Sequence, residues 1–377
     1  MLTHQDAIPY LQRRGYLDSE AVVDGDVLVR DISRRNRNYI VACEDGPGFL
    51  LKQGVGQDPS RPSFHTVSYE SEVYRLFARV RGGDGVAPFL PASHGFDAEE
   101  QVFLLGLLHD STSLLQLYFD TSRFEAAHGE RMAEVLANLH GIALSDVVAA
   151  GFPLEQSPAP TILQIHRPHL RSLEHLSATN IQFVQIVQRF PEIGAALDEL
   201  SATWVEDGLI HGDVKWENFN LCASRPGGPR DQLKLLDWET AGAGDTAWDV
   251  GSVFGAYLSS WILTMPVTGE LPPESFVALA RFPLVDMQPA MRAFWARYVE
   301  RRGWDADESS RRLARVMPFV AARLILTAFE QLQSVSRISG SAIALLQVAS
   351  NVFERPDDAA QHLLGLQPAA ASGEATR

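Results

Sequence analysis

The chain has 377 residues, 46% of them hydrophobic, and carries 32 basic against 47 acidic residues, for a net charge of −15. This length exceeds one ordinary core and predicts a two-lobed or two-domain globular protein. The acidic balance argues against a nucleic-acid-binding surface, because phosphate backbones are bound by basic patches.

The N-terminal segment carries charge early and has no continuous apolar run, so it predicts no secretory signal. Residues 5–15 are expected to be helical. Three strand-like stretches follow between residues 25 and 53, with alternating and β-branched residues: "DVLVRDI", "NRNYIVACE" and "GFLLKQ". Residues 54–65 are rich in Gly and Pro and predict a mobile loop, and residues 68–80 predict an amphipathic helix.

After a strand-like segment at 101–108, the pattern is almost wholly helical. The expected helices are 131–143, 178–205, 248–264, 288–303, 307–335 and 341–353. One pair of short strands, 218–222 and 233–239, interrupts them. The sequence therefore predicts an α+β protein with a small β-rich N-lobe at 1–108, a larger helical C-lobe at 109–365 and a disordered tail at 366–377.

Two features bear on location. The uncharged run 250–267 has the minimum length of a membrane span, but it contains Gly, Ser and Pro and lacks flanking basic residues, so it predicts a core helix and no membrane contact. Cys43 and Cys222 lie far apart in apolar surroundings. This argues against a disulfide framework or a thiolate metal cluster and fits a reducing cytoplasm.

The segment "HGDVKWENF", residues 211–219, concentrates polar side chains between two apolar stretches. A surface loop is the simplest interpretation. However, Asp213 and Asn218 have the Asp-x-x-x-x-Asn spacing of a kinase catalytic loop, in which the Asp orients the acceptor hydroxyl and the Asn binds magnesium. Lys215 would then neutralise charge on the transferring phosphoryl group.

Three other segments complete this pattern in the expected order. Lys52 follows a hairpin on a strand, where its ammonium group could reach nucleotide phosphates. The next helix offers Glu70 and Glu72 to pair with it, and Glu70 is preferred because aromatic residues follow it at i+4 and i+7. The strand "LKLLDWE" delivers Asp237 as a second oxygen ligand for magnesium.

Over about residues 24–265 the sequence resembles the aminoglycoside phosphotransferase and choline kinase superfamily, which has a bilobal protein-kinase-like fold. The resemblance lies in "HGDVKWENF", "LLDWETAGAGDTAWDVG" and "LANLHGI". It implies ATP, or alternatively GTP, with Mg²⁺. It also implies that Asp249 supports the catalytic loop near His211 and caps the helix that begins there.

The nucleotide site departs from the family pattern in two places. The covering loop has no glycine between Asp31 and Val41, so Arg34, Arg35 and Arg37 would contact phosphate by side chain. Gly106 stands where a glutamate often precedes the hinge. The residues expected to bind nucleotide are thus Lys52, Glu70, Arg34, Arg35, Asn36, Gly106 and Leu108.

The acceptor is less determined. An aminoglycoside or amino alcohol suits the acidic chain, with acceptor contacts from acidic residues beyond 285 or from the basic stretch of His166, Arg167 and Arg171. That stretch equally suits an anionic group, so a Ser or Thr hydroxyl of a peptide in a biosynthetic pathway is the alternative acceptor. A nucleotide-binding pseudokinase scaffold is the alternative from another class.

The Gly-x-Gly-x-x-Ala pattern at 242–247 suggests a dinucleotide-binding turn, but no suitable second strand follows it. The sequence leaves the oligomeric state open.

Overall fold

The structure, a computed structural model, describes residues 2–23, 27–33, 36–44, 46–54, 67–154, 159–169, 176–267 and 272–366. It divides into two compact units. The first unit comprises Met1–Leu114, Ser145–Leu154 and Glu217–Ala241, and the second comprises Leu115–Leu144, Glu155–Trp216 and Gly242–Arg377. Nearly all of the predicted 54–65 loop and of the predicted tail lies outside the described residues. The short strands near 218 and 233, expected in the C-lobe, belong to the first unit.

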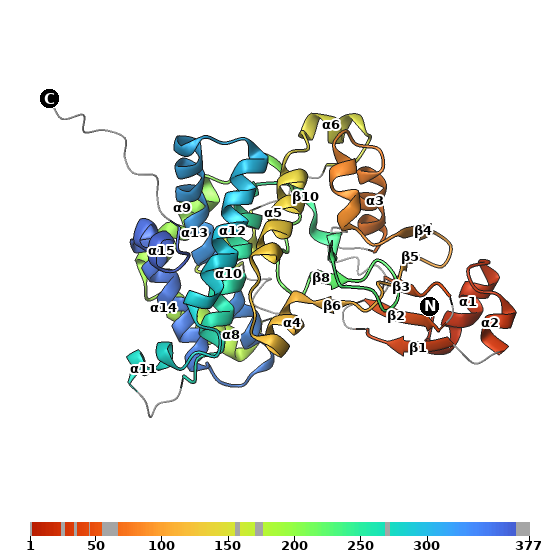
Figure 1. The fold of residues 1–377 in the computed structure, drawn as a ribbon. Helices are drawn as coiled ribbons and strands as arrows, with labels where there is room; N and C mark the ends of the chain where they lie inside the picture. The colour runs from red at the N-terminus through yellow and green to blue at the C-terminus, as the bar shows by residue number, and fades with distance from the viewer. Residues whose placement is uncertain are drawn as a thin grey trace. The chain divides into compact units, whose positions relative to one another are not determined.

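The first unit is built on a five-stranded antiparallel sheet in the order β1-β2-β3-β5-β4 (Figure 1). Its strands are β1 (Val27–Asp31), β2 (Arg37–Cys43), β3 (Phe49–Gln53), β4 (Ser93–Asp97) and β5 (Val102–Gly106). The sequence did not predict β4, since "SHGFD" has no β-branched residue and contains Gly95 at a φ of 103° beside an irregularity in the pairing. The other four strands were predicted.

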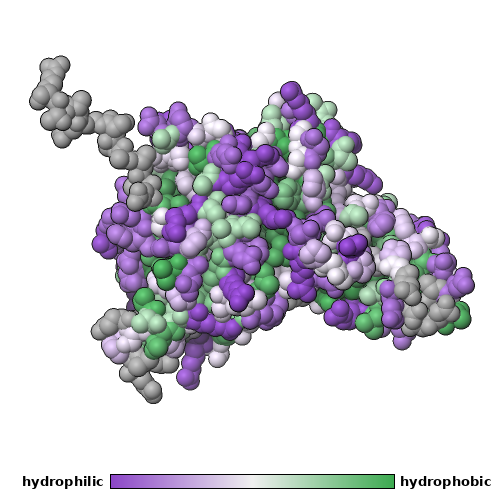
Figure 2. All heavy atoms as spheres, in the orientation of Figure 1, coloured by the Kyte–Doolittle hydropathy of each residue, from purple (hydrophilic) through white to green (hydrophobic). Residues whose placement is uncertain are grey.

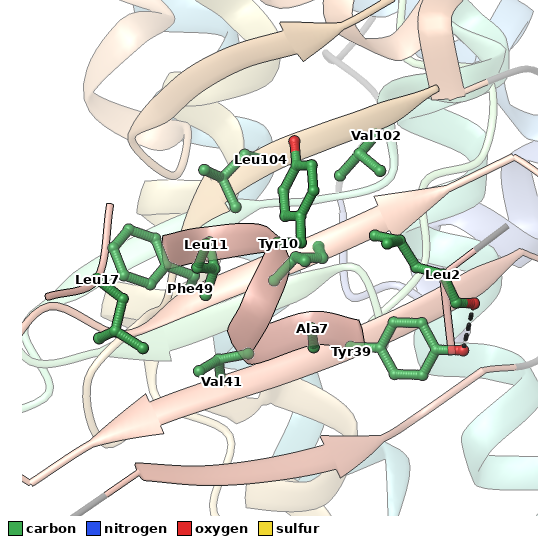
Figure 3. Close-up of a cluster of buried hydrophobic side chains, with 11 residues drawn as sticks. Leu2, Ala7, Tyr10, Leu11, Leu17, Tyr39, Val41, Phe49, Val102 and Leu104 are labelled. Atoms are coloured by element: carbon green, nitrogen blue, oxygen red, sulfur yellow. Dashed lines mark hydrogen bonds between the residues drawn. The ribbon is translucent and has the colours of Figure 1, made fainter. Parts of the chain in front are cut away.

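Side-chain alternation gives this sheet two different faces, because successive residues of a strand point to opposite sides. One face packs against helix α1 (Ala7–Arg13), which α2 (Ser19–Val23) follows. Figure 3 shows the resulting cluster, which contains Ala7, Tyr10 and Leu11 of α1 with Leu2, Leu17, Tyr39, Val41, Phe49, Leu51, Val102 and Leu104. The odd-numbered positions of β3 are therefore committed to this apolar layer.

The even-numbered side chains of β3 point to the face that carries α3 (Val67–Phe77). Tyr74 of α3 packs edge-on against Phe103 of β5, with ring centroids 5.1 Å apart. The rest of this unit comprises most of α6 (Leu144–Ala149) and a second antiparallel sheet in the order β6-β8-β9. Its strands are β6 (Thr112–Ser113), β8 (Phe219–Cys222) and β9 (Gln232–Leu235).

The second unit is mainly helical (Figure 1). Its helices are most of α4 (Leu114–Thr121), then α5 (Ala126–His140), α8 (Ala178–Val187), α9 (Pro191–Ala202), α10 (Thr246–Leu263), α11 (Pro273–Ala278), α12 (Leu284–Arg302), α13 (Ala306–Gln331), α14 (Gly340–Glu354) and α15 (Pro356–His362). Helix α10 is buried along nearly its whole length, as expected for a core helix. Figure 2 shows hydrophilic side chains over much of the visible face of these helices. Among the described residues, no helix is long and apolar enough to cross a membrane.

Two details of this unit differ from the sequence prediction. The helix expected at 178–205 is two helices, because Pro191 starts α9 and the preceding Phe190 is held out of the helical region at φ −116° and ψ 82°. A short antiparallel pair, β7 (Gly208–Ile210) with β10 (Gly242–Gly244), was not predicted. Its antiparallel pairing also argues against a dinucleotide-binding turn at 242–247, which requires a parallel β-α-β unit.

The packing of α5 on α12 depends on Gly129, where a Cβ atom would lie 2.2 Å from the carbonyl oxygen of Ala290. We expect Gly129→Ala to lower the free energy of unfolding by about 1–3 kcal/mol, although alanine favours an isolated helix. Chemical denaturation measures this. Gly54→Ala is the control, because among the described residues the atom nearest to its Cβ would be a Val67 methyl carbon 4.0 Å away; equal losses for both variants would contradict the packing argument.

Candidate active site

Lys52 is the centre of a group of charges in the first unit. Its Nζ atom donates to both carboxylate oxygens of Glu70, at 2.9 and 3.0 Å, and to Oδ1 of Asp237 at 2.6 Å. Only 7% of Lys52 and 2% of Glu70 is exposed. The structure thus pairs Lys52 with Glu70, as the sequence predicted, whereas Glu72 binds Arg75 on the helix surface.

Burial and charge act in opposite directions on this lysine. Burial alone would lower the pKa of Lys52, but the charges of Glu70 and Asp237 and their hydrogen bonds raise it above its usual value. Burial also raises the pKa of Glu70, and the charge of Lys52 opposes this shift. The ammonium group of Lys52 therefore stays protonated at neutral pH.

Strand register places Asn218 and Asp237 at the same end of a hairpin. Phe219 of β8 pairs with Leu235 of β9, and the Asn218 carbonyl accepts a 2.9 Å hydrogen bond from the Leu236 amide. Asp237 follows directly in the left-handed conformation, at φ 60° and ψ 61°. A non-glycine residue in this region is uncommon and is enriched at functional sites, which supports a special role for this carboxylate.

The donor atoms of Asn218 and Asp237 suit a magnesium ion. An amide carbonyl and a carboxylate are hard oxygen ligands, and the Asp237 side chain is 52% exposed even though one oxygen binds Lys52. No group of three or more His, Cys, Asp or Glu residues able to hold a metal occurs in the described part of the chain. Magnesium in nucleotide sites is usually held by one or two protein carboxylates together with substrate phosphate oxygens.

The loop at 211–215 in the second unit is fixed through its backbone. Asp249 on α10 is fully buried, and its Oδ2 accepts from the His211 amide at 2.7 Å while its Oδ1 accepts from the Gly212 amide at 3.0 Å. Gly212 has a φ of 82°, a conformation that favours glycine. The Trp248 indole donates to the Gly212 carbonyl at 3.0 Å.

The predicted support by Asp249 is thus seen, but the predicted cap is wrong. Helix α10 begins at Thr246, and its N-cap is Asp245, whose carboxylate accepts from the Ala247 amide. Asp249 lies one turn inside the helix and bonds the loop instead. The sequence places an aspartate at both positions, and the helix start decides between them.

Two candidate catalytic side chains meet on this loop. Lys215 Nζ donates to Asp213 Oδ2 at 2.6 Å, and both side chains are partly exposed, at 33% and 27%. Burial would lower the pKa of Lys215, but the charge of Asp213 and the hydrogen bond between them raise it. The pair therefore presents a carboxylate and an ammonium group side by side.

The predicted nucleotide-covering residues differ in their contacts. Arg34 and Arg35 lie outside the described residues. Arg37 donates to the Leu2 carbonyl at 2.8 Å and pairs with Gln53 across the strands, so it faces α1 and not the side of Lys52. This placement argues against a phosphate contact by Arg37. The Asn36 amide group donates to Glu239 at 3.4 Å.

Packing in the predicted hinge explains why a glycine stands at position 106. A Cβ atom there would lie 3.3 Å from the Cβ of Ala92, and the Gly106 amide already donates to the Ala92 carbonyl at 2.8 Å. Leu108 is partly exposed just beyond β5. In the predicted acceptor segment, Arg167 pairs with Asp198 on α9, and His166 Nε2 lies 3.0 Å from the same carboxylate. Arg171 lies outside the described residues.

Sequence reasoning missed two site contacts. It did not foresee that Lys52 would bind Asp237, 185 residues away, as well as Glu70. It also gave no role to His140, which lies in "LANLHGI" and whose Nε2 is 3.2 Å from Asp249 Oδ2. The motif itself was the available signal for His140.

The sheet with its lysine–glutamate pair and the His-Gly-Asp loop held by a buried aspartate define a protein-kinase-like phosphotransferase fold. The chain belongs to the phosphotransferase enzyme family, whose sequence profile matches residues 29–294. This confirms the resemblance to the aminoglycoside phosphotransferase and choline kinase superfamily. No curated protein gives a significant match.

Similarity to a solved structure supports this fold, and two further structures are reported beside it. A choline kinase from Cryptosporidium parvum Iowa II has a TM-score of 0.55 at 12% identity, over 96% of this chain and 98% of that one. A choline/ethanolamine kinase family protein from Mesorhizobium loti has a TM-score of 0.49 at 16% identity, over 93% and 97%. Aminoglycoside 2'-phosphotransferase-IIIa in its GDP complex has a TM-score of 0.49 at 13% identity, over 93% and 99%.

We expect Lys52→Met to lower the free energy of unfolding by about 3–5 kcal/mol at pH 7, because it leaves the buried Glu70 carboxylate without its cation. Burial already raises the pKa of Glu70, so the folded variant holds a proton more tightly than the unfolded chain. The loss should therefore shrink as pH falls, which denaturation at several pH values measures.

Two variants control this experiment. Glu72→Gln on the same helix removes a surface pair with Arg75 and should change stability by less than about 1 kcal/mol. Lys52→Met combined with Glu70→Leu should recover much of the stability, since no buried charge of the pair remains. A loss that is independent of pH and persists in the double variant would contradict the proposed origin.

Proposed function

We propose that this protein is an Mg²⁺-ATP-dependent phosphotransferase that transfers the γ-phosphoryl group to an alcohol hydroxyl of a small molecule. The observation that carries the proposal is the buried Lys52, held between Glu70 of the helix and Asp237 of "LLDWE". Such a lysine, positioned by a glutamate next to a metal-binding aspartate, is the recurring phosphate contact of kinase-like enzymes. Membership of the phosphotransferase enzyme family supports the reaction class. GTP is the alternative donor.

The two groups of residues would divide the work. Lys52, oriented by Glu70, would bind nucleotide phosphates, while Asn218 and Asp237 would hold magnesium, which supplies charge stabilisation to the phosphates when it is bound. Backbone groups around Leu108 would hold the base. Asp213 would accept the proton of the acceptor hydroxyl. The hydroxyl oxygen of the acceptor would bond to the γ-phosphorus, while the bond between the γ-phosphorus and the bridging oxygen breaks and that oxygen leaves with ADP. Lys215 would stabilise the transferred charge.

The structure bears on the choice of acceptor. Arg167, part of the basic stretch that suited an anionic acceptor, already pairs with Asp198, and His166 lies 3.0 Å from the same carboxylate. With a net charge of −15, the chain therefore favours a cationic acceptor such as an aminoglycoside or amino alcohol. A peptide hydroxyl would require another anchor.

We expect Asp213→Asn to reduce kcat by about 10²–10⁴-fold while Mg²⁺-nucleotide binding is kept, because only the proton acceptor is lost. The measurement is transfer from γ-labelled ATP to a panel of aminoglycosides, amino alcohols and Ser/Thr peptides, with nucleotide affinity measured in parallel. Asp84→Asn, at an exposed Asp in the short 3-10 helix Gly83–Gly85, is the matched control and should keep full activity.

Other outcomes would change the proposed acceptor or refute the enzyme proposal. Transfer to peptides alone would replace the small-molecule acceptor. If the unmodified protein transfers no phosphate to any acceptor or to water, yet binds Mg²⁺-ATP as tightly as Asp213→Asn does, the enzyme proposal fails and a pseudokinase remains.

A further inference from the structure

A buried chain of hydrogen bonds leads from helix α12 to the catalytic loop. The Tyr298 hydroxyl lies 2.7 Å from His140 Nδ1, and His140 Nε2 lies 3.2 Å from Asp249 Oδ2. The same Asp249 oxygen accepts from the His211 amide at 2.7 Å. At most 3% of Tyr298, His140 or Asp249 is exposed, so water does not compete for these bonds.

The chain fixes which nitrogen of His140 carries the proton. A bare Nε2 facing the Asp249 carboxylate would set two lone pairs against each other, so Nε2 must carry a hydrogen. In a neutral imidazole Nδ1 is then an acceptor, and the Tyr298 hydroxyl is the donor that satisfies it. Without that donor, the other tautomer or a rotated ring becomes accessible.

The orientation of Asp249 matters because it is the shared acceptor of the loop. One oxygen binds the His211 amide and His140, and the other binds the Gly212 amide at 3.0 Å. These backbone groups directly precede Asp213, whose own amide donates to His211 Nδ1 at 3.3 Å. A turn of this carboxylate would therefore move the backbone that carries the catalytic aspartate.

We propose that Tyr298 is a positioning residue for phosphoryl transfer: its hydroxyl holds His140 in the Nε2–H tautomer, and His140 in turn locks Asp249 against the catalytic loop. This inference rests on the proposed role of Asp213 as the proton acceptor. Tyr298 touches neither nucleotide nor acceptor in this scheme. Loss of its hydroxyl is expected to lower kcat without weakening nucleotide binding, because Tyr298 orients only Asp213, which acts during the transfer step.

The test is Tyr298→Phe, which removes one oxygen and keeps the ring. We expect kcat to fall about tenfold, the effect of losing one buried hydrogen bond, while KM for Mg²⁺-ATP stays within about twofold. Tyr10→Phe is the matched control: Tyr10 is equally buried, and its hydroxyl bonds Asp97 at 3.1 Å in the sheet of the first unit. It should leave kcat unchanged.

A second substitution distinguishes the proposed action of Tyr298 through His140 from a general structural role of Tyr298. His140→Gln keeps an amide N–H donor for Asp249 but has no counterpart of Nδ1. In this background Tyr298→Phe should cause no further loss of kcat, so the two effects should be strongly non-additive. A further tenfold loss in the double variant would mean that Tyr298 acts independently of His140 and would overturn the proposal.

Nuclear magnetic resonance tests the chain without relying on activity. The imidazole ¹⁵N signals of His140 should show a protonated Nε2 and a bare Nδ1 in the unmodified protein and a mixture of tautomers in Tyr298→Phe. The His211 and Gly212 amide signals should move in that variant and not in Tyr10→Phe. A protonated Nδ1 in the unmodified protein, or kcat within about twofold of it in Tyr298→Phe, would overturn the inference. These signals remain informative if no acceptor is phosphorylated, which would refute the enzyme proposal alone.

Discussion

The burial of one ammonium group constrains how the first unit is assembled. A lysine that is 7% exposed is tolerated only if its charge is matched, because an isolated buried ion costs several kcal/mol. Both carboxylate oxygens of Glu70 on α3 accept from Lys52, and Asp237, two residues after the end of β9, accepts a third bond. The pairing therefore sets how α3 must sit on the sheet, with Tyr74 against Phe103 beside it.

The alternation of β3 makes this arrangement possible. Phe49 and Leu51 point into the cluster with α1, so Lys52 points to the opposite face, where α3 lies. A shift of one residue in the pairing would place the ammonium group in the apolar cluster and expose the leucines to the charged side. The apolar layer with α1 thus fixes the register on which the charged site depends.

Much of the site could be predicted from the sequence because its residues lie in recognisable local patterns. Lys52 is the penultimate residue of an apolar strand, and Glu70 lies on the amphipathic helix after it. Asp213 and Asn218 have the spacing of a kinase catalytic loop. The contacts of His140 with Tyr298 and Asp249 could not, since they join residues 158 and 109 positions apart through helix packing. Spacing carries no information about such contacts. The Asp249 cap was mispredicted because two aspartates lie four residues apart and only the actual helix start distinguishes them.

Three aspartates with the same side chain are suited to different tasks by their surroundings. Asp249 is fully buried, and its oxygens accept three hydrogen bonds, two of them from backbone amides of the loop. Its surroundings therefore suit it to hold the loop. Asp237 binds Lys52 through one oxygen and remains half exposed, which suits its proposed role as a magnesium ligand. Asp213 is partly exposed beside Lys215, and in the proposed function it would accept the proton of the acceptor hydroxyl. Exposure and the number of hydrogen bonds, more than residue type, distinguish the buried carboxylate that holds the loop from the two that are proposed to take part in the reaction.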